Sequence, residues 1–122
     1  MFYNAIKDFP DLIAAYAVTK FEKFGTAVSL VAQIELSDHS ILHVKDYLFV
    51  DGTRKYAYHW QDATGQLRMR WDNSPHHQYI ATFPHHKHLF SDVVTESQER
   101  NLRDVLEAIR QTVANEKELE KH

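Results

Sequence analysis

The sequence has no cysteine and only three glycines and three prolines among its 122 residues. Without cysteine, disulfides, thiolate nucleophiles and thiolate metal sites are all excluded. No stretch approaches the roughly 20 apolar residues that cross a bilayer. The opening residues, MFYNAIKDFPD, also lack the basic and apolar regions of a secretory signal. We therefore expect a cytoplasmic protein that neither spans a membrane nor leaves the cell by that route.

The chain does have enough apolar material for one core. Hydrophobic residues make up 43% of the sequence and aromatic residues 12%. This composition excludes the disordered and fibrous classes. The length is close to the commonest size of a single domain, so we predict one domain over residues 1–122, with a tail that frays after about residue 114.

Charge is distributed unevenly along the chain, although the net charge is only −3. Residues 54–91 carry five Lys or Arg against two Asp or Glu, while residues 1–53 carry four against seven and residues 92–122 carry five against eight. The basic middle segment also holds five of the nine histidines within the 13 residues from His76 to His88. A basic segment rich in imidazole indicates an anionic partner.

Apolar periodicity predicts the elements of the first half. Residues 2–9 have helical spacing up to Pro10, and residues 12–24 fit a helix or a strand, of which we favour the strand. Residues 26–36 alternate with a period of two, and residues 41–50 are rich in β-branched and aromatic side chains. The Asp51-Gly52 dipeptide that follows favours a tight hairpin.

A second hairpin is predicted over residues 55–72, with a four-residue loop from Asp62 to Gly65. In that register one face pairs large apolar side chains, namely Trp60 with Leu67, Tyr58 with Met69 and Tyr56 with Trp71. The other face pairs His59 with Arg68, Ala57 with Arg70 and Lys55 with Asp72. The hairpin is thus predicted to have one core face and one cationic face.

The rest of the chain predicts a loop followed by a helix. The His-rich stretch after Pro75 has no clear period and suggests a loop with a short strand at one end or both. Residues 96–114 predict a helix, with a capping box formed by Thr95 and Gln98 and one apolar stripe. The fold class is therefore α+β: an antiparallel meander of about five strands with a short N-terminal helix and a longer C-terminal helix packed on one face.

Two Pro-His-His stretches, at residues 75–77 and 84–86, concentrate the reactive groups. Imidazole exchanges protons near neutrality, and cationic side chains stabilise charge on a phosphate, so this composition suits acid-base cleavage of RNA without a metal or cofactor. The candidate catalytic residues are His76, His85, His86, His88, Arg70 and Asp72. The candidate nucleic-acid contacts are Lys55, His59, Arg68, Lys87 and His77.

Three other interpretations stay open. His86, His88 and Asp72 can converge on one metal ion, because residues two apart in an extended segment share a face. No HExxH helix or cysteine supports a known metal pattern. A non-catalytic protein can use the same loop to bind RNA or a protein. Finally, the His-rich stretch can be an ordinary solvated loop.

The run KYAYHWQDATGQLRMRWDNSPHH, followed by TFPHHKH, resembles the TumE-type family of small toxins of prokaryotic toxin–antitoxin pairs. The resemblance spans about residues 26–110, and the two Pro-His-His stretches are its most specific part. Trp71 stands where Tyr or another aromatic is expected, and the turn reads Ala-Thr-Gly-Gln-Leu. The positions that match the family signature are Arg70, Asp72, Asn73, Pro75, His76, His77, Phe83, Pro84, His85, His86 and His88.

The resemblance implies a cytoplasmic growth inhibitor that a helix-turn-helix antitoxin neutralises. The ribonuclease step comes from the residues themselves, with His85, His86 and His76 as the expected proton-transfer groups and Arg70 and Lys87 on phosphate. Such an enzyme is expected to depend on pH between about 5.5 and 8, where imidazoles change charge. The sequence leaves the oligomeric state open, a homodimer included.

Overall fold

The computed structural model describes residues 2–121, which form two helices and seven strands. In chain order these are α1 (Phe2–Lys7), β1 (Ile13–Phe24), β2 (Ala27–Leu36), β3 (Ile41–Leu48), β4 (Arg54–Gln61), β5 (Leu67–Asp72), β6 (His86–Leu89), β7 (Val94–Glu96) and α2 (Leu102–Glu120). The predicted short helix before Pro10 and the strand favoured for residues 12–24 are both confirmed.

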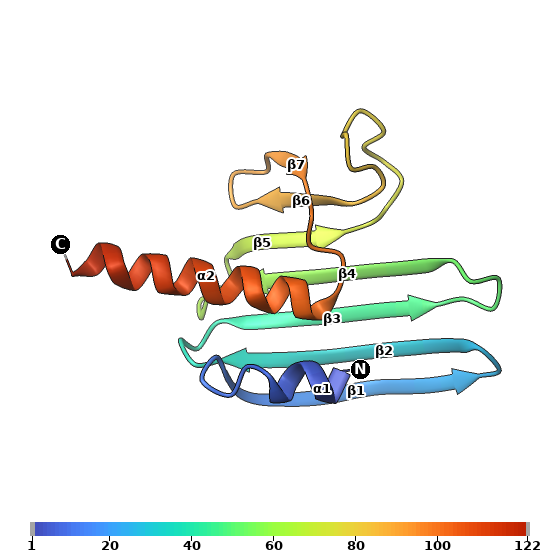
Figure 1. Ribbon diagram of the computed structural model, residues 1–122, viewed down its shortest axis with the longest axis horizontal. Coiled ribbons are helices and arrows are strands. Elements are labelled where there is room, and N and C mark those ends of the chain that lie inside the picture. The colour runs from blue at the N-terminus through green and yellow to red at the C-terminus, as the bar shows by residue number, and fades with distance from the viewer. Residues whose placement is uncertain (1, 122) are drawn as a thin grey trace.

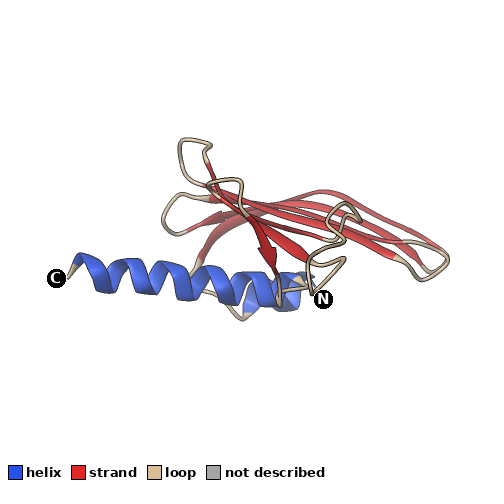
Figure 2. Ribbon diagram, turned by 90° about the horizontal axis from the view of Figure 1, so that it is seen from above, coloured by secondary structure: helices blue, strands red, loops and turns tan. Residues whose placement is uncertain are grey.

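The strands form one antiparallel sheet in which each pairs with its neighbours in the chain, in the order β1 to β7. Both helices lie on the same side of this sheet, α1 over β1 and β2 and α2 across the middle strands (Figures 1 and 2). The α+β class and the placement of the helices on one face are thus confirmed. The predicted number of strands, about five, is wrong, because β6 and β7 extend the meander to seven.

The core lies between the sheet and the helices. Ile109 and Leu106 of α2 are fully buried against Trp60 and Tyr58 of β4 and the other inward residues of the sheet. Alternation along β4 is strict, with every second side chain buried from Tyr56 to Trp60. This alternation assigns Lys55, Ala57 and His59 to the opposite face, which no helix of residues 2–121 covers. We call it the open face.

The predicted pairing of β4 with β5 has the wrong partners, but from Met69 to Asp72 it has the right faces. Trp60 pairs with Met69, not Leu67, and Tyr58 pairs with Trp71, not Met69. The loop closes with the Asp62 amide donating to the Gln66 carbonyl, which leaves three residues between them. A bulge between Trp60 and Gln61 then adds a second shift of one residue. Two single shifts restore the original faces, because side chains alternate with a period of two.

Helix α2 begins and ends later than predicted. Its N-cap is Asn101, whose side chain accepts a hydrogen bond from the Asp104 amide at 2.9 Å, while Thr95 of the expected capping box lies in β7. The helix continues to Glu120, past residue 114, where the tail was expected to fray. Glu116 pairs there with Arg68 of the sheet, a contact that a sequence pattern does not reveal.

Candidate functional site

The open face carries a row of basic side chains across the middle of the sheet. His43 of β3 pairs with His59 of β4, His59 with Arg70 of β5, and Arg70 with His88 of β6. Directly paired residues of antiparallel strands point to the same side, so all four lie on the open face. Asp72 and His86 are also paired, two residues from Arg70 on β5 and from His88 on β6, and so they lie on the same face.

Asp72 is the centre of this group. Its side chain is only 8% exposed, and its Oδ1 atom accepts hydrogen bonds from the Ser74 amide and hydroxyl at 3.0 and 2.9 Å. His86 Nε2 lies 2.9 Å from the same oxygen, while His88 Nε2 and Arg70 Nε lie 3.5 and 3.2 Å from Oδ2. One carboxylate therefore holds two imidazoles and a guanidinium together.

His86 is fixed on both sides of its ring. It is 1% exposed, its Nδ1 lies 3.0 Å from the Pro84 carbonyl oxygen, and its Nε2 lies 3.1 Å from His88 Nε2. Since a carbonyl only accepts, Nδ1 carries a proton that it donates to Pro84. The loop after β5 brings His77 against this pair, with ring centroids 4.6 Å from His86 and 5.6 Å from His88. We call Asp72, His77, His86 and His88 the His-Asp cluster.

The charges of the cluster shift two pKa values. Burial by itself raises the pKa of Asp72, but the two Ser74 hydrogen bonds and the nearby His86 and Arg70 lower it below its ordinary value. Burial lowers the pKa of His88, and His86, His77 and Arg70 lower it further against the opposing attraction of Asp72. The pKa values of the carboxylate and of the neighbouring imidazole are thus both held below their ordinary values.

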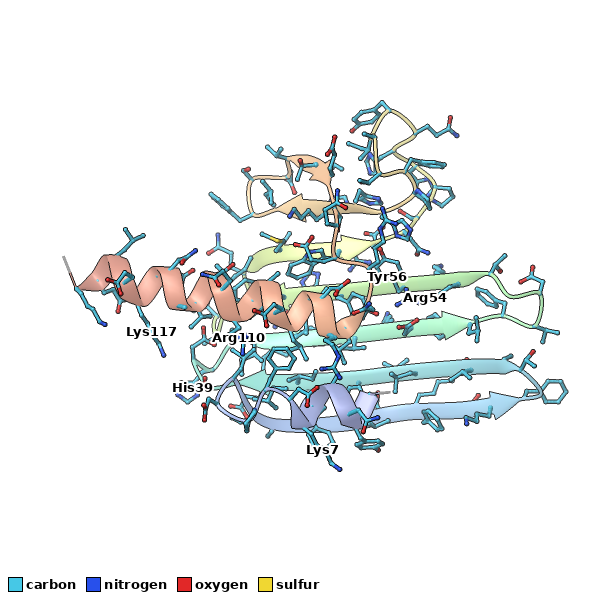
Figure 3. All side chains as sticks on the ribbon, in the orientation of Figure 1. Lys7, His39, Arg54, Tyr56, Arg110 and Lys117 are labelled. Carbon is cyan, nitrogen blue, oxygen red and sulfur yellow. The ribbon has the colours of Figure 1, made fainter. Side chains whose placement is uncertain are left out.

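His85, one of the expected partners of His86, lies on the other side of the sheet. Its Nδ1 is 2.7 Å from the Tyr56 hydroxyl, and its ring stacks on Tyr56 at 5.8 Å between centroids. Arg54 lies over the same tyrosine, beside the N-terminal end of α2 (Figure 3). Burial lowers the pKa of His85, and the charges of Arg100 and Arg54 lower it further. His85 and His86 therefore do not act on one substrate atom together.

Other predicted contacts are also separated from the cluster. Lys87 alternates with His86 and His88 and lies on the helix side, where its Nζ is 3.3 Å from Glu99 Oε1. Arg68 sits at the bulge of β5, stacks over Trp60 and pairs with Glu116 of α2, so the prediction that it faces outward opposite His59 is wrong.

Two further predicted residues are exposed to solvent. Lys55 is exposed and pairs with Tyr47 of β3, so the predicted pairing with Asp72 is wrong. His76 is exposed on the loop next to His77. The structure thus brings together Arg70, Asp72, His77, His86 and His88, with His59 alongside Arg70.

Three groups that build the site were missed by sequence reasoning. Ser74 holds the carboxylate of Asp72, the Pro84 carbonyl holds His86, and the Tyr56 hydroxyl holds His85. The Asp72-Asn73-Ser74 order was a usable signal for the first, because Asp and Asn accept hydrogen bonds from a residue two positions later. The other two depend on tertiary placement and leave no local signal.

The His-Asp cluster is also the place in residues 2–121 where metal-ligating side chains gather. His77, His86 and His88 each offer one nitrogen, and these three atoms lie within 4.8 Å of one another. The metal site considered from the sequence consisted of His86, His88 and Asp72. It shares His86 and His88 with this group, and Asp72 contacts both of them.

Within residues 2–121, neither helix is long and apolar enough to cross a membrane.

Comparisons with known proteins identify the family. No curated protein and no solved structure matches the chain. The model of one protein family, described as Toxin TumE, matches residues 2–113, which extends the expected resemblance over 26–110 to α1 and β1. The chain belongs to the TumE family of toxins.

Proposed function

We propose that this toxin is an endoribonuclease whose reacting groups are those of the His-Asp cluster and Arg70. The observation that supports this most directly is the position of Asp72, which contacts His86, His88 and Arg70 at 2.9 to 3.5 Å on an open face of the sheet. A phosphodiester needs a proton acceptor, a proton donor and a cation close together, and these residue types supply all three.

Exposure divides the roles within the cluster. His86 is buried, so we assign it the role of a positioning residue. It holds the Asp72 carboxylate in place, and that carboxylate in turn orients His88 and Arg70. His88 has a side-chain exposure of 26% and His77 is half-buried, so both can reach a bound strand. In this proposal one of them takes the proton of a 2′-hydroxyl and the other protonates the leaving 5′-oxygen, without a metal.

Arg70 is placed to stabilise the phosphate. Its side chain is 39% exposed while its Nε contacts Asp72, which leaves the terminal guanidinium nitrogens for the substrate. The neighbouring His59 and His43 continue the basic row across β4 and β3. An RNA strand that lies along this row crosses the cluster at one end, so we assign His59 to backbone contact.

Membership of a toxin family implies an antitoxin partner. We propose that this partner is a helix-turn-helix protein and that both act in the cytoplasm. Apolar surface for a protein contact is present where the ends of β1 to β4 extend beyond the helices (Figure 1). Phe21, Phe24 and Phe49 are exposed there by 57%, 83% and 45%.

The test is cleavage of end-labelled cellular RNA by the purified toxin, with and without EDTA. We expect discrete fragments that persist in EDTA and that His88→Gln reduces by about 10²-fold or more. His76→Gln, which alters an exposed imidazole next to the cluster, is the matched control and leaves cleavage unchanged. His85→Gln tests the other side of the sheet.

Three results would contradict the proposal. Full cleavage by a folded His88→Gln, His77→Gln double variant would rule out the assigned proton transfer, and loss of cleavage in His85→Gln alone would move the site to the helix side. Binding of RNA without any cleavage, weakened by salt and by Arg70→Ala, would favour the rival function of a non-catalytic RNA-binding inhibitor.

A further inference from the structure

The arrangement of nitrogen atoms in the His-Asp cluster is more specific than proton transfer alone requires. Three imidazoles from two segments, the loop at His77 and strand β6 at His86 and His88, bring one nitrogen each within 4.8 Å of one another. A tetrahedral zinc ion bound at 2.0–2.1 Å separates its nitrogen ligands by about 3.3 Å. The 3.1 Å between His86 Nε2 and His88 Nε2 is already close to that spacing.

The hydrogen bonds that hold His86 and Asp72 are of the kind found at metal sites. Metal-binding histidines usually donate their second ring N–H to a carbonyl or a carboxylate, which fixes the ring and leaves the other nitrogen to face the ion. His86 does this through Nδ1 and the Pro84 carbonyl at 3.0 Å. The neighbouring carboxylate is also held, since Asp72 Oδ1 accepts two hydrogen bonds from Ser74.

Three atoms of the kinds that bind metal ions converge in the cluster. His86 Nε2 points towards Asp72 Oδ1 at 2.9 Å and towards His88 Nε2 at 3.1 Å, while its Nδ1 faces the Pro84 carbonyl. Both His86 and Asp72 are almost fully buried, so water screens this contact little. A single ion at the centre satisfies the carboxylate and several nitrogens together.

We propose that the His-Asp cluster binds one divalent transition-metal ion of the zinc type through His77, His86 and His88, with Asp72 adjoining as the fourth ligand. Imidazole nitrogens and one carboxylate favour Zn²⁺, Co²⁺ or Ni²⁺ over Mg²⁺ and Ca²⁺, which prefer oxygen. The binding goes beyond the proposed ribonuclease function and does not depend on it. A bound ion engages the same nitrogens that proton transfer uses, so it would regulate that activity.

The experiment measures metal binding without RNA, so that its failure and the failure of the ribonuclease proposal are separate. The full chain, purified without a polyhistidine tag and stripped with a chelator, is titrated with Zn²⁺ in competition with a chromophoric chelator. We expect one equivalent to bind tightly, and His77→Ala and His88→Ala each to weaken binding more than tenfold. His76→Ala and His43→Ala are the matched controls, a loop neighbour and an open-face histidine outside the cluster, and both retain the affinity of the unmodified chain.

A spectroscopic measurement covers the possibility that a variant fails to fold. Co²⁺ added to the unmodified chain should give the visible absorption of a four-coordinate site, which Zn²⁺ then displaces. Circular dichroism of each variant before metal addition reports its folding. The proposal is overturned if the folded chain binds neither ion, or if binding is unchanged in the folded His77→Ala and His88→Ala variants.

Discussion

Arg68 and Arg70 are two residues apart on β5, and exchanging each for alanine should have opposite consequences. Sequence patterning places both on one cationic face, whereas the bulge next to Arg68 turns it to the helix side. Arg68→Ala should therefore cost stability and leave RNA binding unchanged. Arg70→Ala should weaken RNA binding and leave stability nearly unchanged.

The contacts of Arg68 set the size of the stability loss. Its guanidinium lies 4.1 Å from the centre of the Trp60 ring, a cation–π contact worth about 0.5 to 2 kcal/mol. Its pairs with Glu116 and Asp38 are partly exposed, so each adds only about 0.2 to 1 kcal/mol. We expect Arg68→Ala to lower the free energy of unfolding by about 1 to 2 kcal/mol. Arg70 is 39% exposed, and the buried Asp72 keeps its contacts with Ser74 and His86 when Arg70 is removed, so this pair contributes about 1 kcal/mol or less.

Urea unfolding and RNA binding at several salt concentrations separate the two effects. The ligand is a 2′-O-methylated RNA, which has no 2′-hydroxyl and cannot be cleaved by the proposed route. For Arg70→Ala we expect the slope of log affinity against log salt to fall by about one, as for the loss of one phosphate contact. Equal loss of RNA affinity in both variants, with no loss of stability in Arg68→Ala, would refute the assignment of Arg68 to the helix side.

Two further predictions concern the helix cap and pH. Asn101→Ala should lower the free energy of unfolding by about 1 kcal/mol, while Thr95→Ala, at the cap that the sequence suggested, should lower it by less; thermal denaturation compares the two. Burial, Arg70 and His43 hold the pKa of His59 below 6.5 in the folded chain. The unfolded chain therefore binds the proton more readily, and stability should fall as pH drops below 6.5. His59→Gln should flatten that dependence, and an unchanged pH profile in urea unfolding would show that His59 does not cause it.

The sequence is informative about the fold wherever the apolar period is long. The strict alternation of β4 and the stripe of α2 predict both elements and their buried faces. Strand β6, with the sequence His-Lys-His-Leu, has no apolar alternation, so only its pairing with β5 reveals it. The start of α2 was also hidden, because two polar residues, Thr95 and Asn101, are both good caps and tertiary packing selects the second.

The candidate site was predictable in its residue types and less so in its grouping. Composition alone identified the histidines between His76 and His88 together with Arg70 and Asp72. Composition could not assign these histidines to the two faces of the sheet, because the register of β6 relative to β5 decides which histidine faces Asp72. His77 was predicted to contact nucleic acid, and in the structure it lies against His86. Sequence periodicity does not predict the path of an irregular loop, so this contact could not be foreseen.

Strand alternation in the Pro-His-His-Lys-His stretch also makes the length of this segment critical. His86 and His88 lie on the open face, Lys87 lies on the helix side, and His85 contacts Tyr56 on that same helix side. With the preceding loop held in place, deleting one residue between Phe83 and His86 would move each side chain of β6 to the opposite face and present a lysine to Asp72. Substitutions in the loop of residues 78–82 leave that phase intact. Natural variation in this segment should therefore consist of substitutions, with single-residue insertions and deletions removed by selection for activity.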